Sequence, residues 1–166
     1  MFQEAVQLGA KWIKVSLGHF HLDRSNVLDL KEFLSLNHGI ELLIENDQSV
    51  YGGNIRSMKA FFEKAAIHDV PVDMTFDAGN WFFSGQDVRE ALHELSTYLK
   101  YLHLKQVEER EEGLVTLSLD FEGNHRWINV MKCFPAELVK GLEFSIEPKE
   151  AVKKYIDSVT QLSVAR

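Results

Sequence analysis

Four side chains able to ligate a metal ion follow short alternating segments of the chain: Glu45, Asp77, His103 and Glu147. Each stands on the polar side of its segment, near the segment's end, while the opposite parity is apolar. A period of two is typical of a strand with two different faces. Three carboxylates and one imidazole form an oxygen-rich ligand set that suits Mn²⁺, Mg²⁺ or Co²⁺, and zinc also accepts such ligands.

Further polar side chains stand close to these ligand candidates in the sequence. Lys105 lies two residues after His103 on the same face, where it would bind a substrate phosphate or hydroxyl, or form an ion pair within the site. Asn46, Asn80 and Arg126 are the other candidates for substrate contacts, the alternative being solvated loop positions. These four residues form the predicted substrate-binding set.

Six segments carry the period-two pattern, and helical periodicity fills the gaps between them. The predicted strands are residues 12–18, 39–45, 72–77, 101–105, 114–120 and 142–147. The predicted helices are residues 1–8, 27–36, 54–69, 86–98, 126–133 and 149–162. Strands that alternate with helices predict parallel βα units within one domain.

The distribution of apolar residues separates two parallel α/β architectures. Central strands of a doubly wound sheet are apolar on both faces, whereas these strands are apolar on one face only. A barrel accounts for this pattern, because its apolar positions face the helix ring and mixed residues fill the interior. We therefore predict a TIM-barrel type (β/α) fold, in which the four ligand candidates meet at the carboxyl ends of the strands.

The sequence around the ligand candidates resembles the xylose isomerase-like TIM barrels. This superfamily includes sugar isomerases, sugar-phosphate epimerases, inosose dehydratase-type enzymes and endonuclease IV. The matching motifs are Leu-Leu-Ile-Glu-Asn at 42–46, Thr-Phe-Asp-Ala-Gly-Asn at 75–80, Tyr-Leu-His-Leu-Lys at 101–105 and Phe-Ser-Ile-Glu at 144–147. They correspond to the family's Glu, Asp, His and Glu ligands on strands four, five, six and eight.

The resemblance implies a partial barrel. It covers residues 1–166 as one domain of about six βα units, strands three to eight, and lacks the first two strands. It also departs from the family on strand five, where the common Asp-x-x-His pair is replaced by Asp77 and Asn80. An asparagine still hydrogen-bonds a sugar hydroxyl but is a poorer proton carrier than histidine.

The resemblance also implies a function: a divalent-metal-dependent sugar or sugar-phosphate isomerase or epimerase. The metal would hold two neighbouring oxygens of the substrate and polarise its carbonyl, so that proton transfer at the adjacent carbon passes through an enediolate. Glu45 and Glu147 match the family's two catalytic glutamates, one removing and one returning the proton. Two alternatives are a truncated, inactive metal-binding relic and an endonuclease IV-like phosphodiesterase.

The composition of the chain limits the kinds of partner that we expect it to bind. The chain has 18 Lys and Arg against 25 Asp and Glu, a net charge of −7, which disfavours a nucleic-acid partner. No apolar run reaches the ~20 residues of a membrane span, so we expect a cytoplasmic protein. A partial barrel leaves two open sheet edges, and unpaired edges favour association. We therefore expect a homo-oligomer that binds a small sugar or sugar phosphate.

Overall fold

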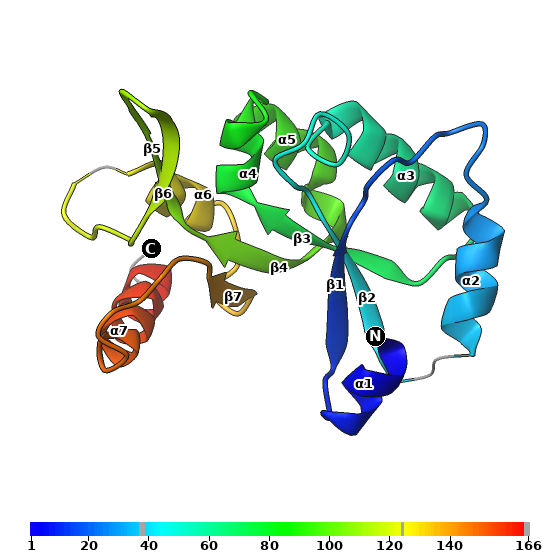
Figure 1. The fold of residues 1–166 in the computed structure, drawn as a ribbon, viewed down its shortest axis with the longest axis horizontal. Helices are drawn as coiled ribbons and strands as arrows, with labels where there is room; N and C mark the ends of the chain where they lie inside the picture. Colours follow the sequence, from blue (N-terminus) through cyan, green and yellow to red (C-terminus); the bar gives the residue numbers. More distant parts are fainter. Residues whose placement is uncertain (37–38, 124, 165–166) are drawn as a thin grey trace.

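The computed structural model describes residues 1–36, 39–123 and 125–164. Its centre is a parallel sheet with the strand order β1-β2-β3-β4-β7. The strands are β1 Trp12–Ser16, β2 Glu41–Glu45, β3 Val72–Asp77, β4 Leu99–Leu104 and β7 Val139–Leu142. Helices lie along one side of this twisted sheet, with α2 towards one end and α7 towards the other (Figure 1). The arrangement is an α/β half-barrel.

The predicted helices are confirmed, with boundaries that move by a few residues. They are α1 Phe2–Gln7, α2 Val27–Ser35, α3 Ile55–Ile67, α5 Val88–Leu95, α6 Arg126–Met131 and α7 Ala151–Val164. The short 3₁₀ helix η1 (Ser96–Tyr98) follows α5, and the short helix α4 (Ala78–Phe83) was not predicted. Asn54 shows how one boundary is set, because its side chain accepts a hydrogen bond from Ser57 N and so caps α3.

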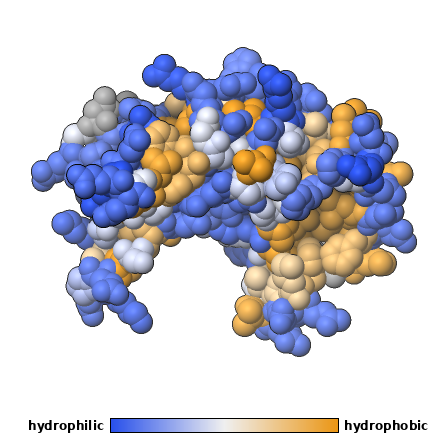
Figure 2. Space-filling view, turned by 45° about the horizontal axis from the view of Figure 1, so that its top comes forward, coloured by the Kyte–Doolittle hydropathy of each residue, from blue (hydrophilic) through white to orange (hydrophobic). Residues whose placement is uncertain are grey.

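The core lies between the sheet and the helices. Met58 and Phe62 on the apolar face of α3 and Met74 and Phe76 on β3 are fully buried in one hydrophobic cluster. Phe62 also stacks on Tyr98, with 4.8 Å between the ring centroids. The opposite face of the sheet carries the polar parity of the strands, as the barrel prediction required. A view of the surface shows an arch that is hollowed between two projecting ends (Figure 2).

The prediction of a barrel strand at residues 114–120 is wrong. β5 (Gln106–Arg110) continues from β4 and pairs in antiparallel fashion with β6 (Gly113–Leu117), forming a separate two-stranded sheet. Only Glu111 and Glu112 separate the two strands. A connection this short makes a hairpin, since parallel neighbours need a crossover of a dozen residues or more. Within the described residues the main sheet therefore has five strands rather than the six expected.

The prediction for the last strand is also displaced. β7 ends at Leu142, where residues 142–147 were expected to form the strand. The apolar parity after Leu142 has another cause, because the Phe144 ring packs edge-on against Tyr155 of α7 at 5.0 Å. The backbone N–H of Glu143 still donates to Leu104 O at 3.0 Å, which keeps Glu143 beside β4.

In the part of the chain that the structure describes, no helix is long and apolar enough to cross a lipid bilayer. Exposed apolar side chains do occur near the α1–α2 end, where Leu8 is 83% exposed and Leu36 is 75% exposed. Orange surface gathers towards that end in Figure 2.

The two outer strands lead to a prediction about assembly. β1 and β7 each have one edge without a strand partner among the described residues. Because unpaired strand edges bind further polypeptide, we expect self-association at micromolar concentration. Multi-angle light scattering should give a mass of at least twice the 19.1 kDa of one chain. A compact monomer across a concentration series would contradict this expectation.

Candidate metal centre

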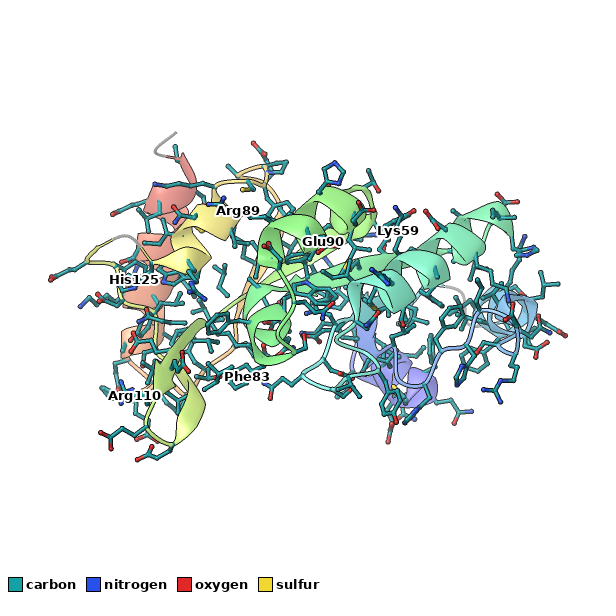
Figure 3. All side chains as sticks on the ribbon, turned by 90° about the horizontal axis from the view of Figure 1, so that it is seen from above. Lys59, Phe83, Arg89, Glu90, Arg110 and His125 are labelled. Atoms are coloured by element: carbon teal, nitrogen blue, oxygen red, sulfur yellow. The ribbon has the colours of Figure 1, made fainter. Side chains whose placement is uncertain are left out.

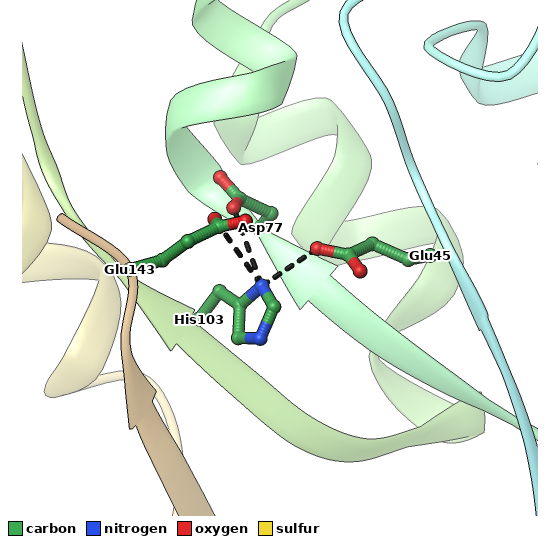
Figure 4. A group of neighbouring side chains, drawn as sticks. All are labelled: Glu45, Asp77, His103 and Glu143. Carbon is green, nitrogen blue, oxygen red and sulfur yellow. Dashed lines mark ion pairs between the residues drawn. The ribbon is translucent and has the colours of Figure 1, made fainter. Parts of the chain in front are cut away.

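Four potential metal ligands converge at the carboxyl end of the parallel sheet. Glu45 ends β2, Asp77 ends β3, His103 lies near the end of β4, and Glu143 directly follows β7. One ligand atom from each lies within 4.8 Å of all the others. Figure 4 shows the three carboxylates gathered around His103 Nδ1, at 2.6 Å for Glu45, 3.5 Å for Asp77 and 3.3 Å for Glu143.

The atoms that face one another in this group are in ion-pair contact but lack hydrogen bonds of acceptable geometry. Glu45 Oε1, Asp77 Oδ2 and His103 Nδ1 are all buried, and no hydrogen bond of acceptable geometry reaches them among the described residues. Buried polar atoms without hydrogen bonds are rare in folded proteins because they are costly. A cation at their common centre would satisfy all three. The donor set therefore fits a divalent metal ion.

The structure corrects the fourth ligand. Glu147 is exposed and lies outside the group, and Glu143 takes its place. Both glutamates belong to the same parity of the predicted strand, so the alternation alone did not distinguish them. Because the strand ends at Leu142, the first glutamate of that parity reaches the site and the later one does not.

Asn46 has a positioning role in the structure rather than a place open to substrate. It is fully buried, its Nδ2 donates to Asp77 O at 2.8 Å, and its Oδ1 accepts from Asp77 N at 2.9 Å. The amide thus pairs with both backbone groups of Asp77. Asn80 adds a third bond, since its Nδ2 donates to Asn46 O at 2.8 Å. These bonds fix the end of β3 against the end of β2.

Asp77 serves the chain in two ways. Its Oδ1 accepts from Asn80 N at 2.8 Å and caps α4, which starts at the next residue. Its Oδ2 remains turned towards His103. The cap explains why β3 passes directly into a short helix here, because an aspartate at this position satisfies a free N–H of the first turn.

Lys105 is a direct neighbour of the ligand group. Its Nζ lies 2.9 Å from Asp77 Oδ2, 2.8 Å from Glu143 Oε2 and 2.8 Å from Asn80 Oδ1. Its stem runs over Gly79, where an added Cβ would lie 2.6 Å from Lys105 Cε. The structure therefore brings Lys105 and Asn80 into the site, with the lysine supplying positive charge beside two carboxylates.

The crowding of charges changes the acidity of each group. Burial raises the pKa of Asp77 to about 6, against the lowering effect of His103 and Lys105. Burial opposes the charged forms of His103 and Lys105, but the surrounding carboxylates outweigh it and raise both pKa values. Burial would also raise the pKa of Glu143, yet its bonds to His103, Asp77 and Lys105 bring that pKa below its usual range.

Arg126 lies away from the four ligands. Its guanidinium stands over the Phe82 ring, 4.2 Å from the centroid, in the wall of a cavity of about 820 Å³. This cavity runs between α4 and α5 on one side and β5 and α6 on the other. Figure 3 shows the region from above, with Arg89 on α5 and His125 at the start of α6. Lys105 lines the same cavity and separates it from the ligand group.

Comparison of sequences finds no matching family model and no matching curated protein. Comparison of structures finds similar folds. One is the probable 3-DHS dehydratase AsbF, involved in petrobactin synthesis, from Bacillus anthracis, with 13% identity and a TM-score of 0.58 over 98% of this chain and 65% of that one. Another is the apo form of the 3-keto-D-glucoside 4-epimerase YcjR from E. coli, with 15% identity and a TM-score of 0.55 over 97% of this chain and 66% of that one.

The chain therefore spans slightly less than two thirds of the length of each of these enzymes. At such identities the likeness concerns the fold. It supports the prediction of a partial barrel at the level of an α/β half-barrel with a parallel sheet.

The role of Asn46 can be tested by Asn46→Asp. The carboxylate cannot donate to Asp77 O and would face that carbonyl, so we expect a loss of about 3 kcal/mol in unfolding free energy, measured by urea denaturation. Mn²⁺ affinity should fall about 10- to 100-fold, as for other residues that orient ligands. The matched control is Asn54→Asp, which keeps a good N-cap on α3 and should change stability by less than about 0.5 kcal/mol. Equal effects of the two variants would contradict the assignment.

Proposed function

We propose that this chain carries the metal-binding and catalytic site of a divalent-metal-dependent sugar or sugar-phosphate isomerase or epimerase. The observation that carries the proposal is the convergence of Glu45, Asp77, His103 and Glu143, each of which offers a ligand atom within 4.8 Å of all the others. Three carboxylates and one imidazole suit Mn²⁺, Mg²⁺ or Co²⁺, with zinc as a further candidate.

The reaction would move a proton at the carbon next to a carbonyl. A bound divalent ion would polarise that carbonyl and stabilise the negative charge of the enediolate. Glu45 and Glu143 approach the centre from opposite sides of His103, one from β2 and one from the β7 end (Figure 4). In this proposal one of these two glutamates removes the proton, and the other, once it has taken up a proton from water, returns one to the substrate from the opposite face or at the neighbouring carbon.

The surroundings of Glu143 suit this chemistry. Lys105 contacts Glu143 Oε2 at 2.8 Å and would stabilise its carboxylate once the proton has left. Glu143 is the most open of the four ligands, with 42% of its side chain exposed, whereas Asp77 is fully buried. A substrate would therefore enter from the Glu143 side and leave Asp77 as a purely ligating carboxylate.

The comparisons support this proposal at the level of fold. One of the similar structures is named an epimerase of a 3-keto-glucoside and the other a probable dehydratase. Both names describe enzymes that act on small molecules. We propose as the substrate of this chain a ketose, a ketose phosphate or a related hydroxy-ketone.

Metal binding is tested first by calorimetric titration with Mn²⁺. The wild-type chain should bind one ion, and Asp77→Asn should abolish this binding, because the amide oxygen is a poor substitute for a carboxylate ligand. Asn retains the cap to Asn80 N, so the fold should survive. Asp73→Asn is a matched control on the same strand, half exposed and distant from the group, and should bind as the wild type does. If the folded wild-type chain does not bind Mn²⁺, the metal assignment is wrong.

Catalysis is tested by exchange of solvent deuterium into ketoses and their phosphates, followed by NMR with Mn²⁺ at saturation. Glu45→Gln and Glu143→Gln should each slow exchange by about 10²- to 10⁴-fold, because each removes a proton-transfer group. Glu147→Gln should exchange at the wild-type rate, since Glu147 is exposed and outside the group. Manganese binding without any exchange in the wild type would favour a non-catalytic metal-binding protein instead.

A further inference from the structure

The cavity beside Arg126 is separate from the candidate metal centre. Its volume of about 820 Å³ lies within the range of roughly 300 to 1,000 Å³ that is typical of small-molecule pockets. Lys105 and Gly79 form its wall towards the metal centre, with the lysine stem packed against the glycine and the ammonium paired with Asp77 and Glu143. The four candidate ligands are not among the described residues that line it. A molecule in this cavity would therefore not contact them.

Much of the cavity wall is apolar. The Phe82 ring of α4, Val88 and Leu92 of α5, Val107 of β5 and Val130 of α6 all line it. Apolar side chains from four elements thus surround one space. Removing apolar surface from water is favourable, so this wall suits the hydrocarbon part of a bound molecule.

The same wall carries hydrogen-bond donors that have no acceptor. The Arg126 guanidinium stands over the Phe82 ring at 4.2 Å, and Arg89 of α5 is exposed. Neither guanidinium forms an ion pair or a hydrogen bond among the described residues. Trp127 is buried in the wall, and its Nε1–H also lacks an acceptor in the described part of the chain. A guanidinium fork with free N–H groups matches the geometry of a carboxylate.

Most acidic side chains of the wall are already engaged. Asp87 Oδ1 accepts hydrogen bonds from two backbone N–H groups and caps α5. Glu108 accepts from Gln106 Nε2 at 2.5 Å and lies 3.6 Å from Arg110. Glu109 is exposed, and its side chain has no such partner within the described ranges. The unused capacity of the wall therefore belongs mostly to donors, which favours an anionic ligand over a cationic one.

We propose that this cavity is a second ligand site, which binds a carboxylate with an apolar body, aliphatic or aromatic. Arg126 pairs with the carboxylate, and the apolar wall holds the hydrocarbon. A singly charged carboxylate is favoured over a phosphate dianion, because Glu108 and Glu109 in the same wall repel negative charge. The site requires no metal ion, and the inference does not rest on the proposed function.

The test is calorimetry on the full chain in the presence of EDTA, with four probes. Octanoate and naphthoate carry a carboxylate on an aliphatic and an aromatic body. Octanamide keeps the aliphatic body without the charge, and acetate keeps the charge without the body. Octanoate or naphthoate should bind about 10- to 100-fold more tightly than both octanamide and acetate, the range of a charge-assisted hydrogen bond. The tighter of the two carboxylates identifies the body.

In Arg126→Met the affinity for the preferred carboxylate should fall about 10- to 100-fold, while octanamide binds as before. Arg126→Lys keeps the charge but not the fork, so its affinity should lie between those of the wild type and Arg126→Met. Arg56→Met is the matched control: it removes an exposed arginine from the first turn of α3, outside the cavity, and should bind as the wild type does.

Asp77→Asn separates this site from the metal centre. It should bind the preferred carboxylate with wild-type affinity, because Asp77 does not line the cavity. Carboxylate binding that requires Mn²⁺ or is lost in Asp77→Asn would place the probe on the metal and overturn the inference.

Three further results would overturn it: no binding of either large carboxylate to the wild type, equal affinities for octanoate, naphthoate and octanamide, or a preference for the carboxylate that persists in Arg126→Met. None of these results changes the expectations for Mn²⁺ binding or deuterium exchange. A chain that fails to bind Mn²⁺ but binds the carboxylate would remove the proposed function and support this second site.

Discussion

The structure depends on holding three carboxylates against one buried imidazole. Like charges at this separation repel strongly where water is excluded, so the arrangement requires positive charge nearby. The chain provides it on both sides, with Lys105 bonded to Asp77 and Glu143, and Lys14 at the far nitrogen of His103. These two lysines offset part of the negative charge of the three carboxylates.

The carboxylates stay in place because the backbone beneath them is fixed. Asn46 pairs with both backbone groups of Asp77, and Asn80 ties the ends of β2 and β3 together. Gly79 leaves the space through which the Lys105 stem reaches the site. Asparagine and glycine here have roles that a list of ligand types does not reveal. The amides of Asn46 and Asn80 hold the backbone that carries the ligands, whereas the sequence analysis considered both residues only as substrate contacts.

The sequence predicted the parts of this site that depend on local pattern. Glu45, Asp77 and His103 end strands whose alternation is regular, and the alternation alone placed all three on one face. Glu143 was missed because parity repeats every two residues and does not say where a strand stops. The point where β7 ends is set by tertiary contacts, namely the bond from Glu143 N to Leu104 O and the packing of Phe144 on Tyr155.

The β5–β6 hairpin was misread for a similar reason. Residues 114–120 alternate as a barrel strand would, and an amphipathic strand looks the same in a hairpin and in a barrel wall. The short connection before Gly113 carried the missing information, since its length permits only antiparallel pairing. The helix α4 escaped notice because six residues give too short a pattern, and its start is set by the Asp77 cap rather than by periodicity.

The four ligands come from β2, β3, β4 and the residue after β7, which are consecutive neighbours in the sheet. No strand beyond these five is needed to bring the ligand atoms within 4.8 Å of one another. The convergence of these candidate ligands is therefore a property of the half-barrel itself.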